Sequence, residues 1–220
     1  MSTSELFESL PSFLSMKSAH PAVQALDAPE VAFRLAQIVE LKDHPGSGHA
    51  ARVGRLSALV AEALGMSTED VETIGLAAQL HDIGKVGIPD QILFKDAPLT
   101  LEEMDVMKTH TTIGATLLSG SSLQLFRMAE VIALYHHENW NGTGYTPGLE
   151  REGIPLVGRI VRVTDSFDAM TMTRAFGEHW RQDSALEFIR TQAGQHFDPR
   201  VVAALVEVVS DHPSGSNDVS

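Results

Sequence analysis

The chain of 220 residues contains no cysteine. Disulfides, thiolate zinc sites, iron-sulfur clusters and cysteine nucleophiles are therefore excluded together. Any metal that the protein holds must be bound by the imidazole nitrogens of histidine and the carboxylate oxygens of aspartate or glutamate.

Positive charge and long apolar runs are also scarce. The formal net charge is −13, and no basic stripe interleaved with aromatic residues is present, so long DNA or RNA is a poor candidate partner. The amino terminus, MSTSELFESLPSFLSMKSAH, lacks a secretory pattern, and no run approaches the roughly 20 apolar residues of a membrane helix. We therefore expect a cytoplasmic protein with no membrane partner. A small anionic substrate stays open, because bound cations can reverse the potential inside one pocket.

The composition is that of a folded globular protein, with 43% hydrophobic and 20% charged residues. The length suits one large domain with a real core. We expect this domain to span residues 29–212, after a short helical lead at 1–28 and before a disordered tail at 213–220. The lead either packs on the domain or serves as a dimerisation segment or the remnant of a sensor module.

Apolar residues recur every three or four positions, the pattern of amphipathic helices, and no segment alternates with period two. The fold class is therefore all-α. The expected helices are 29–41, 48–64, one that is capped by Ser67 and runs into His81, one that starts at Thr100 and carries His110 in its middle, 123–137, 155–172, and one that starts at Asp198. The stretch ENWNGTGYTPGLEREG, residues 138–153, predicts a long loop.

Residue types that bind metals are dispersed along these helices: His49, His81, Asp82, His110, His136, His137 and Asp165. Intervals of roughly 26 to 32 residues place no two groups on one helix, so the groups can meet only where several helices converge on a buried point. Asp82 has two oxygens with which to bridge two cations. Two metals about 4 Å apart can hold a hydroxide that attacks a phosphoryl group.

Individual members of this set have structural explanations as well. A neighbouring His-Asp pair is common by chance, His110 alone is typical of a half-buried histidine, and His136 with His137 can favour a helix C-terminus through its dipole. Asp165 lies in the apolar stretch IVRVTDSFDAM, where an ionised carboxylate requires a cation, several hydrogen bonds or a salt bridge with an arginine such as Arg162 or Arg159.

Four motifs, HDIGKVGIPDQILFK, HHE followed by NGTGY, RVTDSFDAMTMTR and GQHFDP, occur in the order and at the approximate spacing found in the HD-GYP family of metal-dependent phosphohydrolases. The resemblance covers roughly residues 30–210. It implies an HD-type helical bundle with the additional helices of that family. It also implies a centre of two or three iron or manganese ions, and hydrolysis of the bacterial messenger cyclic di-GMP to pGpG or GMP.

The resemblance assigns roles to particular residues. It implies that the seven dispersed histidines and aspartates are the metal ligands, with Asp82 as the bridge. Lys85 resembles a lysine that contacts the substrate phosphate or the attacking hydroxide, so Asp82 and Lys85 are the expected catalytic residues. Arg174 resembles a basic residue that grips the distal phosphate or base, although the following AFGEHW lacks the proline and second basic residue often found there.

The family's loop signature is altered in this chain. Asn141-Gly142 stands where Asp-Gly usually precedes the GYP triplet, and Thr146 replaces the proline of that triplet. Asn141 loses a negative charge but keeps an acceptor oxygen, and Thr146 has a backbone NH and a freer φ than proline. We expect Asn141, Gly144 and Tyr145 to contact the substrate, and we expect the changes to affect recognition rather than metal binding.

The number of metals depends on an acid shortly before His49, which some family members supply as a glutamate for a third ion. Pro45 lies four residues before His49, and the nearest acids upstream are Asp43 and Glu40. We therefore expect two divalent ions rather than three, with Glu40 or Asp43 as candidates for a third. Imidazole and carboxylate ligands suit manganese or ferrous iron without excluding zinc, nickel or magnesium.

Three functions follow from these residues. The first is an active cyclic di-GMP phosphodiesterase, in which Lys85 and the metals neutralise the charge on phosphorus. The second is a degenerate module for dinucleotide sensing or protein interaction, for example in a homodimer or with a GGDEF-type signalling protein. The third is a phosphohydrolase of another nucleotide. The residues outside the domain leave no room for a receiver or other sensory domain, so we expect regulation by partners, metal oxidation or the amino-terminal lead.

Overall fold

A computed structural model of the chain describes residues 27–43, 46–146, 148–172 and 180–211. The regular elements of these residues are all helical, apart from one isolated bridge between Ala193 and Phe197. The predicted all-α class is confirmed. Arg174 and nearly all of the expected lead and tail lie outside the described residues, so the domain boundaries stay predictions.

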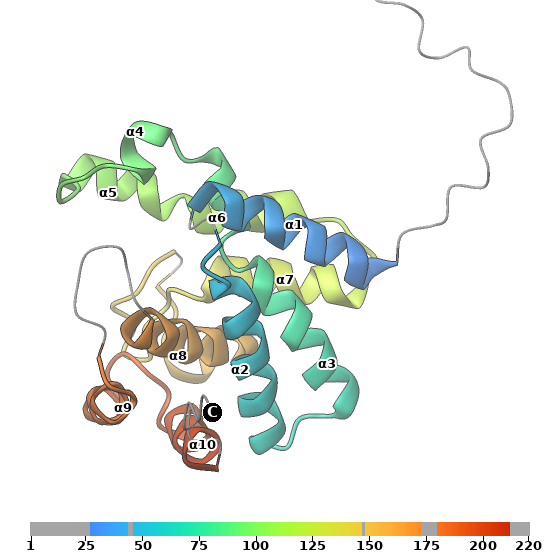
Figure 1. Cartoon of the computed structure of the whole chain (residues 1–220), viewed down its shortest axis with the longest axis vertical. Coiled ribbons are helices and arrows are strands. Elements are labelled where there is room, and N and C mark those ends of the chain that lie inside the picture. Colours follow the sequence, from blue (N-terminus) through green and yellow to red (C-terminus); the bar gives the residue numbers. More distant parts are fainter. Residues whose placement is uncertain (1–26, 44–45, 147, 173–179, 212–220) are drawn as a thin grey trace, which may run out of the picture.

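The chain forms ten α-helices within the described residues. They are α1 (Ala28–Asp43), α2 (His49–Ala63), α3 (Thr68–Ala77), α4 (Asp90–Leu93), α5 (Leu101–Lys108), α6 (His110–Leu118), α7 (Gln124–Tyr135), α8 (Leu156–Thr171), α9 (Gln182–Thr191) and α10 (Pro199–Asp211). The short 3-10 segments are η2 (Ala78–Leu80), η3 (Ile83–Gly87) and η4 (Arg151–Gly153). Figure 1 shows α2, α7 and α8 in the middle of the bundle, with α1 toward one end and α9 and α10 toward the other.

The core is built from aliphatic side chains at helical spacing. Helix α2 packs against α3 and α8, while α7 packs against α3, α6 and α8. Val53, Ile74, Ile132 and Ile160 are fully buried between these helices, as is Leu205 of α10, which packs against α2 and α8. Burial stabilises the fold by roughly 1.5–3 kcal/mol for each such side chain. This packing fixes the helix ends that carry the predicted metal-binding residues.

The prediction of one helix from Thr100 through His110 is wrong. Thr100 and Glu103 form a capping box at the start of α5, but α5 ends at Lys108 and α6 begins at His110. The helix breaks where the backbone of η3 approaches it: a Cβ atom on Gly84 would lie 1.8 Å from the carbonyl oxygen of His110. Only glycine permits that approach. As a result His110 lies at the start of a helix rather than in its middle.

The other predicted helices are present, with ends that differ by a few residues, and the described residues of the stretch 138–153 contain no helix apart from the short η4. Two helices were not predicted. Helix α4 has only four residues, and α9 buries only a narrow stripe of Ala185, Leu186 and Ile189. None of the described helices combines the length and the apolar character that crossing a bilayer requires.

Candidate metal centre

The seven predicted metal-binding residues converge from five separate places in the chain. They come from the first turns of α2 and α6, the junction of η2 and η3, the end of α7 and the middle of α8. The predicted convergence of different helices is therefore confirmed. Their ligand atoms form two clusters, and within each cluster these atoms lie within 4.8 Å of one another. The first cluster is His49, His81 and Asp165, and the second is Asp82, His110, His136 and His137.

Asp82 lies between the two clusters and directs one oxygen toward each. Its Oδ2 is 3.2 Å from Nε2 of His81 in the first cluster. Its Oδ1 is 3.4 Å from Nε2 of His110 and 3.6 Å from Nε2 of His136 in the second. The two oxygens of Asp82 thus have the placement that a carboxylate needs to bridge two cations.

Backbone carbonyl groups fix the orientation of three of the imidazole rings. Nδ1 of His81, His110 and His136 lies 2.8, 2.8 and 3.0 Å from a carbonyl oxygen of the preceding helical turn. Because a carbonyl only accepts hydrogen bonds, Nδ1 carries the proton and Nε2 presents its lone pair to the centre. Nε2 of His110 and Nε2 of His136 are only 3.4 Å apart.

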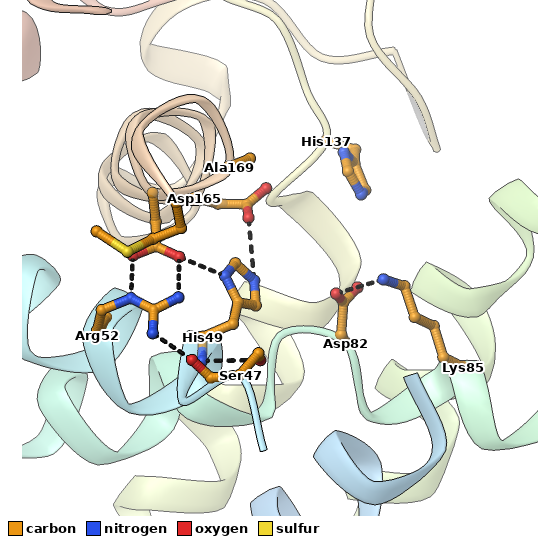
Figure 2. A pocket seen from close by; sticks show the side chains of 10 residues that line it. Ser47, His49, Arg52, Asp82, Lys85, His137, Asp165 and Ala169 are labelled. Carbon is orange, nitrogen blue, oxygen red and sulfur yellow. Dashed lines mark hydrogen bonds and ion pairs between the residues drawn. The ribbon is translucent and has the colours of Figure 1, made fainter. Parts of the chain in front are cut away.

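His49 is oriented by a side chain instead. Its Nδ1 lies 2.7 Å from Oδ2 of Asp168, and Arg52 donates to both oxygens of Asp168 at 2.7 and 2.9 Å (Figure 2). Nε2 of His49 then lies 3.4 Å from Oδ1 of Asp165. Neither Asp168 nor Arg52 is among the residues that the sequence predicted for the centre. The signal was the three-residue spacing of Asp165 and Asp168, which places both carboxylates on one face of α8.

The residues of the centre fit divalent cations. Nε2 of His81 and Oδ1 of Asp82 are buried and form no hydrogen bond within the described part of the chain. Leaving such a polar atom without a partner costs about 1–3 kcal/mol. A lone pair of an imidazole that faces a carboxylate oxygen is repelled by it unless a proton or a metal cation lies between them. Imidazole nitrogens and carboxylate oxygens are together suitable ligands for such a cation.

The pKa shifts differ between the two clusters. In the first cluster burial lowers the pKa of His49, but Asp165 and Asp168 outweigh burial and raise it. Burial likewise lowers the pKa of His81, but Asp82 outweighs burial there and raises it. A metal ion must therefore displace a proton at these two rings.

In the second cluster His110 and His137 need no such displacement. Burial lowers the pKa of His110 to about 4, and burial together with His136 holds the pKa of His137 well below its usual range. Both rings are therefore neutral at pH 7, as metal binding requires. Burial raises the pKa of Asp82, but Lys85 and His81 outweigh that effect and hold it well below the ordinary value. Asp82 is therefore ionised.

The structure shows which side chains pair with the carboxylate of Asp165. Asp165 pairs with His49 and His81, while Arg162 donates to Asn139. The salt bridge with Arg162, which the sequence left open, is therefore not formed.

The two acids considered for a third metal have other partners. Asp43 accepts from Nζ of Lys85 at 2.6 Å, and Glu40 accepts from the backbone NH of Gly48.

A pocket of about 380 Å³ opens over both clusters. Its wall includes His49, Asp82, Lys85, His137 and Asp165 (Figure 2). Nζ of Lys85 is 2.7 Å from Oδ2 of Asp82. The pocket thus brings two cationic side chains, Lys85 and Arg52, together with the metal-binding groups to a single space of a size that suits a small ligand.

The loop after α7 contributes Tyr145 and holds it against the centre. The Tyr145 ring stacks on His137, with ring centroids 4.7 Å apart and planes 21° apart. Gly144 permits this position, because a Cβ atom there would lie 2.3 Å from the backbone nitrogen of Asn139. Thr146 forms a hydrogen bond with Thr111 that ties the loop to α6.

Asn141 takes part in the loop and is not among the residues that line the pocket. Its Oδ1 accepts from the hydroxyl of Thr143 at 2.6 Å, and its Nδ2 donates to Gln195 at 3.3 Å. Asn141 therefore has a structural role in shaping the loop. Its predicted contact with substrate, like those of Gly144 and Tyr145, stays a prediction.

Comparison with known proteins gives the family. The HD domain matches residues 34–201. The cyclic di-GMP phosphodiesterase response regulator RpfG of Xanthomonas campestris pv. campestris is 47% identical over 177 residues, which cover 80% of this chain and 47% of that protein. A cyclic di-GMP phosphodiesterase of Thermotoga maritima is 44% identical over 179 residues, which cover 81% of this chain and 49% of that protein. The chain thus spans about half the length of these curated relatives.

Solved structures show the same fold. The cyclic GMP-AMP specific phosphodiesterase V-cGAP3 of V. cholerae has a TM-score of 0.63 at 19% identity, over 84% of this chain and 49% of that chain. The HD domain of the L. monocytogenes phosphodiesterase PgpH, in complex with cyclic-di-AMP, has a TM-score of 0.56 at 19% identity, over 83% of this chain and 98% of that chain. These likenesses establish the architecture of an HD-type helical bundle.

Proposed function

Because the chain belongs to the HD domain family, we propose that it is a metal-dependent phosphodiesterase that hydrolyses cyclic di-GMP to pGpG, GMP or both. The observation that carries this proposal is the pair of histidine and aspartate clusters that share Asp82 beneath one pocket. The names of the relatives at 44% and 47% identity support cyclic di-GMP as the substrate.

We propose that two divalent ions, iron or manganese, are held here. The first ion is assigned to His49, His81 and Asp165 and the second to His110, His136 and His137, with Asp82 shared between them. A third ion is not part of the proposal, because Asp43 and Glu40 are engaged by Lys85 and by the backbone of Gly48. Bound metals would activate water for attack on phosphorus and neutralise the charge that develops there.

The side chains around the pocket would orient the substrate. Burial lowers the pKa of Lys85, but Asp82 and Asp43 outweigh that effect and raise it, so Nζ stays protonated and can donate to a phosphate oxygen. Burial raises the pKa of Tyr145 to about 12, so its phenol is also a hydrogen-bond donor at neutral pH. We assign Asn141 and Gly144 to the shape of the loop that presents Tyr145. Arg174, the proposed grip on the distal phosphate or base, lies outside the described residues.

The altered loop favours one alternative. Thr146 joins Thr111 by a hydrogen bond where the family has a proline, and Asn141 lacks the charge of the family's aspartate. In this alternative the module keeps its metals and binds the dinucleotide without turning it over. It then acts by contact with a second copy of the chain or with a GGDEF-type signalling protein.

Product analysis separates these functions. Protein purified without oxygen is loaded in turn with manganese and iron and incubated with cyclic di-GMP, and the products are separated by chromatography. Metal-dependent pGpG or GMP supports the phosphodiesterase. Intact cyclic di-GMP at full metal occupancy supports the sensing module. Cleavage of a different cyclic dinucleotide under the same conditions supports another nucleotide substrate.

A further inference from the structure

A second pocket adjoins the one above the metal-binding clusters. It has a volume of about 440 Å³, within the roughly 300–1,000 Å³ range of small-molecule sites. Its lining residues come from α2, α8 and α10 and from the start of α9 with the residues next to it. Arg52, Asp168 and Met172 line both pockets, so the two spaces share one wall. A ligand that reaches past this wall can occupy both spaces at once.

The lining of the second pocket combines an apolar interior with an aromatic ring at its edge. Leu56, Leu59 and Phe167 supply part of the apolar surface. Trp180 is 44% exposed, and Phe188 contacts it edge to face, with ring centroids 5.4 Å apart. An exposed indole that is braced from one side offers a flat surface on which a nucleobase can stack.

Two arginines at this pocket have no carboxylate partner among the residues that the structure describes. Arg55 and Arg181 are exposed and form no ion pair within the described ranges, whereas Arg52 is paired with Asp168. The chain as a whole carries a net charge of −13. Two exposed guanidinium groups beside one pocket are therefore a local concentration of positive charge in an acidic protein, and they favour a ligand that offers acceptor atoms.

We propose, on the basis of the phosphodiesterase function above, that this second pocket binds the guanine nucleoside of the dinucleotide that lies away from the scissile phosphate. Trp180 stacks on the base, while Arg55 and Arg181 donate hydrogen bonds to its edge. Guanine presents two acceptors, O6 and N7, on that edge, whereas adenine presents one acceptor and one donor. Arginine can only donate. The pocket therefore selects guanine over adenine.

The test compares two substrates on the manganese-loaded enzyme. Cyclic di-GMP reaches both pockets, whereas bis(p-nitrophenyl) phosphate has no nucleobase and needs only the metal-binding clusters. Trp180→Ala, and the double variant Arg55→Gln with Arg181→Gln, should each raise the KM for cyclic di-GMP by about tenfold. Both should leave hydrolysis of bis(p-nitrophenyl) phosphate unchanged. The arginine variant should also reduce the preference for cyclic di-GMP over cyclic di-AMP.

Matched controls carry the same changes away from the pocket. Arg127→Gln removes an exposed arginine of α7, and Phe94→Ala removes an aromatic ring that is 55% exposed after α4. Neither control variant should change the hydrolysis of cyclic di-GMP or of bis(p-nitrophenyl) phosphate. An equal effect of the pocket variants on both substrates, or no effect on cyclic di-GMP, would overturn the proposal.

A binding measurement separates this proposal from the phosphodiesterase function. The chain has two tryptophans, Trp140 and Trp180. Cyclic di-GMP should quench the fluorescence of Trp140→Phe and leave that of Trp180→Phe unchanged. Quenching without product formation supports the pocket and rejects the enzyme. Product formation without quenching of Trp180 supports the phosphodiesterase function and rejects the second pocket. If neither quenching nor product is observed, both proposals are rejected.

Discussion

Nδ1 of His49 and Oδ2 of Asp168 lie 2.7 Å apart, although 119 residues separate them in the chain. Three other histidines of the centre direct Nδ1 to the backbone carbonyl of the residue three positions earlier in the chain. His49 begins its helix and has no preceding helical turn to supply such an acceptor. Its orientation therefore depends on a carboxylate from α8, which Arg52 holds by two hydrogen bonds.

Asp168→Asn should weaken one metal site and leave the other intact. The negative charge of Asp168 orients His49 and makes its imidazole a better ligand. An amide in place of the carboxylate removes that charge. Loss of such a supporting partner typically lowers metal affinity about 10- to 100-fold. Calorimetry with manganese, together with metal analysis, should show that one of the two ions binds with lower affinity. Asp105→Asn, which breaks only an exposed pair with Lys108, should bind as the unaltered protein does. Equal weakening of both ions would contradict this role.

Asp82→Ala should remove both metals and the activity. Both oxygens of Asp82 face ligand atoms, one in each cluster, so each site loses a ligand together with the negative charge that offsets the cations. Metal content per protein measures the effect, and circular dichroism confirms that the helices remain. A variant with full metal content and full rate would show that Asp82 does not bridge.

The double variant Asn141→Asp with Thr146→Pro should raise turnover of cyclic di-GMP without altering metal content. The proline restricts the loop beside Tyr145, and the aspartate restores a charge that the family carries there. The matched control is Thr111→Val, which removes the hydrogen bond between Thr111 and Thr146, together with the one that Thr111 donates to the carbonyl of Lys108, and leaves the loop sequence unchanged. An unchanged kcat in the double variant would mean that the altered loop is neutral for catalysis.

Gly84→Ala should destabilise the fold where η3 meets α6. The new Cβ would lie 1.8 Å from the carbonyl oxygen of His110 and 2.5 Å from the backbone nitrogen of Gly114, so backbone must shift. Overpacking of this kind typically costs about 1–3 kcal/mol. Urea unfolding should detect the loss. Gly153→Ala is the control, because a Cβ there meets no atom within 4 Å. Equal stability of the two variants would show that the close approach is relaxed in solution.

The sequence by itself determined the helical class and the chemistry of the centre. Apolar spacing of three and four residues predicts most of the helices, because only that period buries one face of a helix. The absence of cysteine restricts metal ligands to imidazole and carboxylate. The wide intervals from His49 to Asp165 required several helices to meet, and the structure shows that meeting.

Only the tertiary structure decided how these residues divide and what supports them. The split into two clusters, the opposite directions of the two Asp82 oxygens and the pairing of His49 with Asp168 each join residues that are far apart in sequence. The start of α6 at His110 depends on the approach of Gly84 from another segment. The hydrogen bonds of the Asn141 side chain with Thr143 and Gln195 also form only in the folded protein. Local spacing records which face of a helix is buried, but the partner of a side chain is fixed only when the helices pack.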